Sequence, residues 1–256
     1  MQIGKRQKQL NGFTIVELLI VITVIGILAA IAIVSYNGIQ DRARATSLMS
    51  DLDTAAATLE LDLKQSGAYP LTVATANSGN GLVASPNNTY QYAVGSNASS
   101  PTYCLTASNG SQSYMVNQDG PVILGHCNLL PNSDIAKPGP SEFLQYADLA
   151  PIFDRYGLVP YTVSFDIKSA NITNKNTMLV YMQNGSSTKY SFVSQWLPVT
   201  TSYVRQSLTA TPSISNAPDT QAFLAFYGVY GSGNIPSVKN VKVELGNTAS
   251  AWTQGP

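Results

Sequence analysis

The sequence predicts an α+β fold, in which one long N-terminal helix precedes two β-rich globular parts. Residues 13–34 form an unbroken apolar run, and apolar residues then recur at helical spacing as far as residue 63. Short alternating segments separated by Gly, Pro, Asn and Ser fill the rest of the chain. We divide the chain into a basic leader (1–12), a membrane-spanning helix (13–34), its amphipathic continuation (35–66), a small antiparallel β head (67–127) and an all-β jelly-roll sandwich (128–256).

The composition excludes several classes of function. Only 11% of the 256 residues are charged, and 14 Lys and Arg balance 14 Asp and Glu. Without the three basic residues of the leader the balance is 11 to 14, so the chain lacks the basic surface of a nucleic-acid-binding protein, and no nucleic-acid partner is predicted. One His and two Cys are too few for a zinc finger or a multi-metal scaffold.

The apolar run from Phe13 to Val34 predicts a membrane-spanning helix. Its 22 residues contain one ionisable side chain, and a helix of this length spans about 33 Å, close to the thickness of a hydrocarbon core. Lys5, Arg6 and Lys8 precede the run, which places the N-terminus in the cytoplasm and the bulk of the chain outside. A cleaved secretory signal is the alternative, but the run is long for one and no small-x-small cleavage site follows it.

Glu17 is the ionisable residue inside this run. A charge in the bilayer costs about 2.5–3.5 kcal/mol even on the lenient insertion scale. No cationic side chain lies in the run to pair with it. The partner therefore has to come from another chain or from a newly formed group, or the carboxyl group stays protonated in lipid.

The leader and the apolar run together resemble the signature of type IV pilins and type II pseudopilins. A short basic leader ends in Gly12, the sequence FTIVE (13–17) follows, and the match extends over about residues 10–45. The resemblance implies that a prepilin peptidase cuts after Gly12 and N-methylates the new amine of Phe13. It further implies that an inner-membrane assembly platform and its ATPase move the subunit from the cytoplasmic membrane into an extracellular filament of pilin subunits. In such filaments the residue matching Glu17 attracts the Phe13 amine of a neighbouring subunit.

The helix is expected to continue beyond the membrane. These pilins often have a proline where this sequence has Val34, although the matching Gly26 is present. Without that proline the sequence favours an uninterrupted helix over the unwinding that the family shows on assembly. Gly67 and the following Tyr69-Pro70 predict the helix terminus. An apolar stripe packs the outer half of the helix against the head: Leu48, Leu52, Ala55, Ala56, Leu59 and Leu63.

The head is predicted to be a small antiparallel sheet with polar loops. Residues 71–127 contain no Lys or Arg and a single acid, Asp119. Cys104 and Cys127 are the only cysteines, and in an exported domain such a pair favours a disulfide. A nucleophile or metal site built from a cysteine and His126 is the alternative, but it lacks a third member, and His126 and Cys127 would point to opposite faces of a strand.

The last part is predicted to be a β-sandwich. Residues 161–168 alternate apolar with polar side chains, and Val241, Val243 and Leu245 alternate with Lys242 and Glu244, so each strand has one buried and one wet face. The run 222–229 is apolar on both faces, as in a central strand. A short turn near residues 148–156 is the one helical signal.

The sandwich resembles jelly-roll carbohydrate-binding modules, of a kind also found on phage tails. The opening NLLPN (128–132), the segment YTVSFDIKS (161–169) and the close (238–252) carry this likeness. It implies aromatic side chains that stack against sugars, with core packing as the alternative role. It implies no identifiable cofactor: structural Ca²⁺ is common in such modules, but no acidic cluster marks its ligands. The candidate ligand-binding residues are Trp196 and Tyr230, which Pro198 and Gly231 place near loops, followed by Tyr190, Tyr227 and Tyr181.

These features favour a structural subunit of a type IV pilus-like filament, with a sandwich that meets glycans or a cell surface. A minor pilin at the filament tip acting as an adhesin, and a pseudopilin of a type II secretion or DNA-uptake system, stay open. A catalytic function is disfavoured, because no nucleophile can be identified that would pair with the single His and no carboxylates occur at a catalytic spacing.

Overall fold

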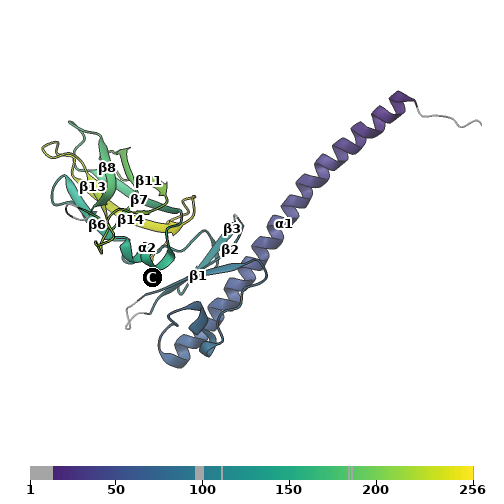
Figure 1. Cartoon of the computed structure of the whole chain (residues 1–256), viewed down its shortest axis with the longest axis horizontal. Coiled ribbons are helices and arrows are strands. Elements are labelled where there is room, and N and C mark those ends of the chain that lie inside the picture. The colour runs from purple at the N-terminus through teal and green to yellow at the C-terminus, as the bar shows by residue number, and fades with distance from the viewer. Residues whose placement is uncertain (1–13, 96–100, 111, 184, 186, 256) are drawn as a thin grey trace, which may run out of the picture. The chain divides into compact units, whose positions relative to one another are not determined.

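A computed structural model describes residues 14–95, 101–110, 112–183, 185 and 187–255 (Figure 1). Gly12 and Phe13, the predicted processing residues, lie outside this described part. The chain divides into two compact units, Met1–Thr46 and Ser47–Pro256, and each is described by itself. The second unit contains both predicted globular parts.

The N-terminal helix α1 (Ile15–Ser66) has no break at Val34, which confirms the predicted continuity. It ends at Gly67, whose φ of +78° lies in the left-handed region and whose N–H donates to the Leu63 carbonyl at 2.8 Å. Glycine adopts this conformation without a Cβ penalty, so the predicted terminus is confirmed for the expected reason.

The outer half of α1 carries the head. Four strands pair in antiparallel order β1-β2-β3-β4, and Leu48, Leu52 and Leu59 of the helix are fully buried in the core that this sheet forms. The predicted stripe is therefore a packing face. The elements of the head are η1 (Val73–Thr75), η2 (Asn77–Gly79), β1 (Thr89–Val94), β2 (Tyr103–Asn109), β3 (Gln112–Asn117) and β4 (Ile123–Leu124).

The sandwich consists of two four-stranded antiparallel sheets, β10-β8-β13-β6 and β11-β7-β14-β5, with a small pair β12-β9. The apolar strand β13 lies between β8 and β6, as its sequence predicts, and the short helix α2 occupies the predicted turn. The elements are β5 (Lys137–Pro138), β6 (Phe143–Asp148), α2 (Ala150–Tyr156), β7 (Tyr161–Ser169), β8 (Thr177–Gln183), β9 (Tyr190–Ser191), β10 (Ser194–Pro198), β11 (Val204–Ala210), β12 (Ser213–Ile214), β13 (Phe223–Tyr227) and β14 (Pro236–Leu245).

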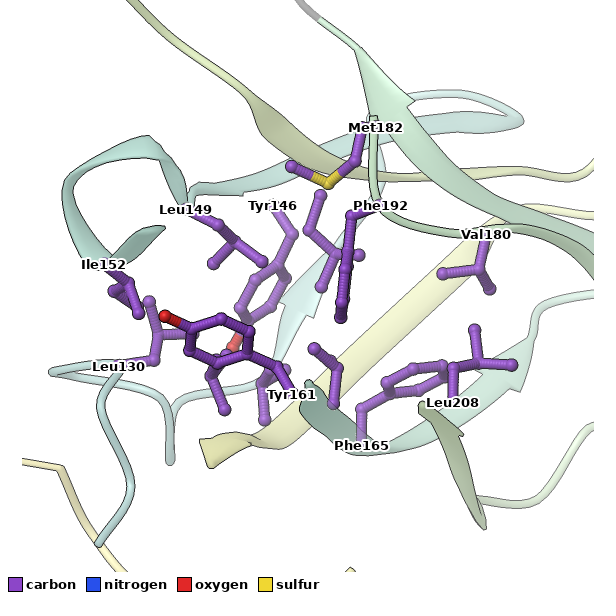
Figure 2. Packing of buried hydrophobic residues seen from close by; sticks show 14 of the residues in the cluster. Leu130, Tyr146, Leu149, Ile152, Tyr161, Phe165, Val180, Met182, Phe192 and Leu208 are labelled. Carbon is purple, nitrogen blue, oxygen red and sulfur yellow. The ribbon is translucent and has the colours of Figure 1, made fainter. Parts of the chain in front are cut away.

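The core of the sandwich lies between the inner faces of these two sheets (Figure 2). Phe165 of β7 and Phe226 of β13 meet edge to face with ring centroids 5.0 Å apart. Val180 of β8 and Val243 of β14 are fully buried in the same cluster. The period-two pattern of the sequence thus identified the inner faces of β7 and β14 correctly, but Thr162 and Ser164, expected on the solvent-exposed face of β7, are each only 1% exposed.

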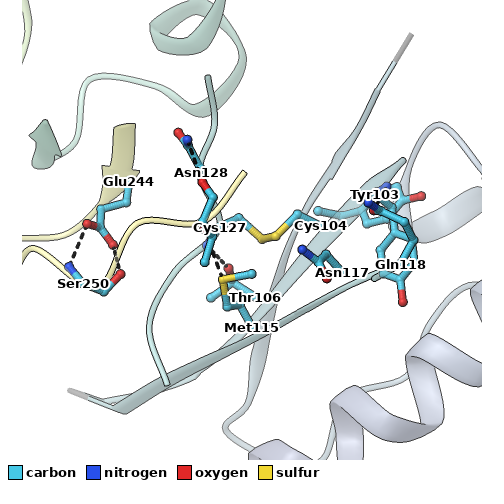
Figure 3. Close-up of a disulfide and its surroundings, with 12 residues drawn as sticks. Tyr103, Cys104, Thr106, Met115, Asn117, Gln118, Cys127, Asn128, Glu244 and Ser250 are labelled. Atoms are coloured by element: carbon cyan, nitrogen blue, oxygen red, sulfur yellow. Dashed lines mark hydrogen bonds between the residues drawn. A yellow bond between two sulfur atoms is a disulfide. The ribbon is translucent and has the colours of Figure 1, made fainter. Parts of the chain in front are cut away.

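The outer face of β14 differs from the prediction. Lys242 and Glu244, expected on a wet face, are 1% and 0% exposed. The segment after β14 covers them: the Lys242 Nζ donates to the Ala251 carbonyl at 2.8 Å, and Ser250 donates its N–H to Glu244 at 2.9 Å (Figure 3). Burial lowers the pKa of Lys242 below its usual value, and the nearby Glu244 opposes that shift. Strand alternation could not reveal a cover that comes from elsewhere in the chain.

Cys104 of β2 and Cys127 form the predicted disulfide (Figure 3). Both sulfur atoms lie in the core cluster that also holds the sandwich residues, so the bridge stands where the head meets the sandwich. Beside it, the Asn128 side chain donates to the Val241 carbonyl at 2.9 Å and to the Thr253 carbonyl at 3.0 Å. The join between the two β parts is therefore a packed, hydrogen-bonded region.

Candidate functional site

The first candidate region is the start of α1. The Glu17 carboxylate accepts the Thr14 N–H at 2.9 Å and the Thr14 hydroxyl at 2.8 Å, while the Glu17 N–H donates to the Thr14 Oγ1 at 3.2 Å. This reciprocal arrangement is a capping box, with Thr14 at the N-cap and Glu17 at the third helical position. It satisfies donors at a helix end that have no partner inside the helix.

The capping box supplies a partner that the sequence analysis missed. We expected Glu17 to need a second chain, a new amine or a proton, yet its carboxylate finds two donors within its own turn. The signal was present, since Thr followed three residues later by Glu before an apolar run is the sequence pattern of a capping box. The role of Glu17 in pairing with Phe13 of a neighbour stays a prediction.

The helix that follows is exposed and apolar. It is the one helix in the described part of the chain long and apolar enough to cross a membrane, and its most apolar stretch is not buried against any other element. Ile15, Leu19 and Val34 are more than half exposed. Burying such a surface in lipid or against other helices is favourable, so this segment has the features of a membrane anchor.

The second candidate region is the outer face of the sheet β10-β8-β13-β6. The strand register aligns Trp196, Leu179, Tyr227 and Phe143 in one row across the four strands. Directly opposed residues of antiparallel strands project from the same face, so the row forms a continuous apolar surface about 14 Å long. We call this row the aromatic platform.

A pocket of about 180 Å³ opens at one end of the platform. Tyr227 and Phe143 belong to the platform, while Tyr181 and Gln183 follow on β8 and Tyr230 comes from the loop after β13. The rings of Tyr227 and Tyr230 meet edge to face with centroids 5.3 Å apart. The structure thus brings together three aromatic residues that the sequence analysis could only name separately.

The polar groups of the pocket are neutral. The Tyr181 hydroxyl donates to the Gln183 side-chain oxygen, and the Gln183 amide nitrogen donates to the Gly185 carbonyl at 3.3 Å. Burial, reinforced by Tyr230 and Tyr227, raises the pKa of Tyr181 above its usual value, so this phenol stays protonated. Aromatic faces beside neutral hydroxyl and amide groups suit an uncharged polyhydroxylated ligand.

Trp196 is exposed to solvent, whereas Tyr190 is buried. Trp196 is 44% exposed on the edge strand β10, where the Lys175 ammonium lies 4.5 Å from its ring centroid. Tyr190 is a correction to the prediction, because its ring is buried edge to face against Phe153 and its hydroxyl donates to Asp154. Tyr190 belongs to β9, which pairs with β12 and is not part of the sheet that carries the platform. Its buried ring fills the core and cannot stack against a ligand.

Tyr230, which forms one wall of the pocket, lies in a tight loop after β13, and Gly228 is the first residue of that loop. A Cβ at this position would lie 1.8 Å from the Asn234 carbonyl oxygen, which is backbone and cannot swing away. We expect Gly228→Ala to lower the free energy of unfolding by about 1–3 kcal/mol and to displace Tyr230. Urea unfolding of the full chain measures this change. The matched control is Gly120→Ala, because its backbone is outside the left-handed region and a Cβ there has only an ordinary contact, 3.6 Å from the Asn117 side-chain oxygen.

No further ligand chemistry is visible in the described residues. In that part of the chain, no three His, Cys, Asp or Glu side chains gather as a set of metal ligands. Cys104 and Cys127 form the disulfide, so neither has a free thiol that could act together with His126. The two candidate regions therefore offer apolar association through α1 and aromatic stacking on the platform.

Comparison with known proteins matches the N-terminal region. Residues 8–33 fit the family described as the prokaryotic N-terminal methylation motif. The chain is 33% identical over 67 residues to the type II secretion system core protein G of Pseudomonas aeruginosa, which covers 26% of this chain and 47% of that protein. It is 46% identical over 60 residues to the type IV major fimbrial protein FimA of Dichelobacter nodosus, which covers 22% of this chain and 38% of that protein.

The chain thus spans less than half the length of the curated relatives it matches. The matches confirm that its N-terminal region is similar to that of type IV pilins and type II pseudopilins and carries the prepilin methylation motif.

Comparison with solved structures finds only distant similarity. The tripod of the bacteriophage Tuc2009 baseplate matches with a TM-score of 0.32 and 17% identity, covering 67% of this chain and 68% of that one. The N-terminal cellulose-binding domain of Cellulomonas fimi β-1,4-glucanase C matches with a TM-score of 0.26 and 13% identity, covering 65% of this chain and 100% of that one. These scores support no conclusion on function, and the fold assignment rests on the strand pairing described above.

Proposed function

We propose that this chain is a structural subunit of a type IV pilus-like filament, held first in the cytoplasmic membrane and then polymerised through α1. The observation that carries the proposal is the exposed apolar stretch of α1, which begins with the Thr14–Glu17 capping box and lies within a segment that matches the methylation motif. An apolar helix of this kind is stable either in lipid or among copies of itself. A helix that associates with copies of itself serves a structural purpose, so the proposed role is mechanical.

The proposed partners follow from the motif. A prepilin peptidase would cut after Gly12 and methylate Phe13, and an inner-membrane platform with its ATPase would assemble the subunits outside the cell. The likeness to a secretion core protein as well as to a fimbrial protein keeps a pseudopilin as the second candidate.

The experiment is to shear filaments from cells and locate the chain by immunogold labelling. Labelling along whole filaments supports a major subunit, and labelling at the ends alone supports a minor tip adhesin. Absence from sheared filaments, with the chain retained in the membrane, contradicts the filament proposal and favours a pseudopilin. A Gly12→Ile variant serves as the control, because it should keep the mass of the uncut chain and stay in the membrane.

We further propose that the aromatic platform binds neutral glycans at a surface that the filament meets. Tyr227, Tyr230 and Trp196 expose ring faces that can stack on the C–H face of a sugar, and the phenol and amide groups of the pocket can meet its hydroxyls. The support is the alignment of Trp196 and Tyr227 on one face of one sheet, with the Tyr230 ring beside that of Tyr227.

A glycan array probed with the full chain in detergent tests this proposal. We expect Trp196→Ala and Tyr230→Ala each to weaken binding about three- to tenfold, the size of a single aromatic contact of 0.5–1.5 kcal/mol. Tyr203→Ala is the matched control, because Tyr203 lies just before β11 in the other sheet and contacts Lys168 and Lys239. A blank array, or equal losses in the control, would leave the platform without this role.

A further inference from the structure

The loop that carries Tyr230 has an unusual backbone. Between β13 and β14 the chain turns through Gly228–Asn234, and Val229 adopts a φ of +71°. A β-branched residue in the left-handed region is strained, and such a conformation persists only where surrounding contacts hold it. Ser232 supplies contacts within the loop, since its hydroxyl donates to the carbonyls of Gly228 and Val229 at 2.6 Å.

Glu142, which lies outside the loop, makes three of the contacts that hold it in place, and the Asn234 side chain makes another by donating to the Thr177 carbonyl at 2.8 Å. One carboxylate oxygen of Glu142 accepts the N–H of Gly231 at 3.2 Å and the N–H of Gly233 at 3.1 Å. The Glu142 carbonyl accepts the N–H of Gly228 at 2.7 Å. Glu142 therefore accepts hydrogen bonds from three positions along the loop. The two amides bound by its carboxylate belong to the residues on either side of Ser232, and the first of them directly follows Tyr230.

Glu142 also adjoins the pocket. It immediately precedes Phe143, which lines the pocket opposite the loop and is paired with Tyr227 across β6 and β13. Tyr230 is connected to the same pair, because its N–H donates to the Tyr227 hydroxyl at 3.3 Å. One carboxylate thus links the strand under the pocket to the loop that forms its wall.

We propose that Glu142 is a positioning residue of the pocket: its carboxylate clamps the strained loop Gly228–Asn234, so that Tyr230 stands as a fixed wall beside Tyr227. This inference concerns the loop alone, and it rests on the proposed glycan binding only for what the wall is used for. Without the clamp the loop N–H groups can turn to water, because Gly231 is exposed. The core is untouched, so the fold survives while Tyr230 loses its place.

The charge state of Glu142 supports the clamp. Its own N–H and those of Gly233 and Gly231 lower the pKa of its carboxyl group below the usual value, against a small opposing effect of burial. A carboxyl group with a lowered pKa in the folded state contributes order above its ordinary pKa and loses it as the pH falls through the folded value. The other titratable groups around this pocket in the described residues are the phenols of Tyr181, Tyr227 and Tyr230, and burial raises the pKa of the Tyr181 phenol.

Hydrogen exchange of the Gly231 and Gly233 amides, in the full chain in lipid nanodiscs, tests the clamp. We expect Glu142→Ala to speed exchange at these two amides at least tenfold, while the amides of β13 keep their protection. Glu142→Gln retains an acceptor oxygen and should have an intermediate effect. Asp134→Ala, which removes an exposed acid of the same sandwich, is the control and should change neither amide.

The pH profile separates positioning from general stability. After correction for intrinsic exchange, the wild-type loop should open as the pH falls below the usual range of a glutamate, and the loop of Glu142→Gln should show no such step. Unchanged protection in Glu142→Ala, or the same acid step in Glu142→Gln, overturns the proposal. Loosening of the loop in a chain that binds no array glycan would refute the proposed glycan binding and leave the clamp standing.

Discussion

Replacing Glu17 with valine is expected to reduce incorporation of the subunit into filaments more than a hundredfold, while the membrane-inserted subunit stays abundant. In the proposed assembly the Glu17 carboxylate faces the Phe13 amine of a neighbour in an apolar bundle. Removing one member of a buried ion pair leaves the other charge without a partner and costs about 3–5 kcal/mol, which corresponds to about two to three and a half powers of ten in an equilibrium constant. The measurement is the ratio of subunit in sheared filaments to subunit in membranes.

Two further variants distinguish the ion pair from the capping box. Glu17→Gln keeps an oxygen that can accept from the Thr14 N–H and hydroxyl but removes the charge, so it should assemble almost as poorly as Glu17→Val. Thr14→Ala keeps the charge and removes the side-chain cap, which costs about 1 kcal/mol of helix stability. It should assemble with only a modest loss, and Thr14→Ser should be normal.

The opposite ranking would contradict the pairing of Glu17 with a neighbouring amine. If Glu17→Gln assembles like the wild type while Thr14→Ala fails, the function of Glu17 is to start the helix, and the charge has no part in assembly. If every variant yields normal filaments, neither interaction selects the register of the subunits.

Removing the disulfide is expected to lower the free energy of unfolding by about 3–4 kcal/mol, because the bridge closes a long loop in the unfolded chain. The two cysteines are 23 residues apart, and both are 1% exposed. For a unit of this size the loss corresponds to a fall in melting temperature of about 10 °C. The variant is Cys104→Ala with Cys127→Ala, which leaves no unpaired thiol or hydroxyl in the core.

Thermal unfolding of the full chain in detergent, followed by tryptophan fluorescence, measures this loss. Trp252 is partly buried in the segment that follows β14, so it reports on the join between head and sandwich. Reductant should lower the melting temperature of the wild type to that of the double variant and should not affect the variant itself. An equal melting temperature with and without the bridge would show that packing around Thr106 and Met115 holds the join without help.

Several features of the fold could be predicted because they depend on local sequence. The helix ends at Gly67 since only glycine enters the left-handed region freely, and the strands of the sandwich bury the faces that their alternation indicates. The disulfide was predicted because the chain has two cysteines in a domain that we expected to be exported. The capping role of Thr14 could also have been predicted, since Thr followed three residues later by Glu is the sequence pattern of a capping box.

Other features depend on residues far apart in the chain. Lys242 and Glu244 are buried because the segment of Ser250 and Ala251 returns over them, and nothing in their own strand indicates this. Tyr190 and Tyr227 both occur in aromatic, strand-forming sequence, yet one fills the core and the other lies on the platform. Which face a strand shows to solvent depends on which strands it pairs with, and pairing across 40 or more residues leaves no local trace, as between Leu179 and Tyr227.

The sequence by itself determined the anchor of this protein: a capped apolar helix of membrane length, a methylation motif at its start and a glycine at its end, all of them properties of neighbouring residues. The tertiary structure alone decided the second site. Strand register aligned Trp196, Tyr227 and Phe143, and Glu142 fastened a distant loop beside them. The physical reason is range, since a helix satisfies its hydrogen bonds within four residues, whereas a sheet satisfies them between segments that only folding brings together.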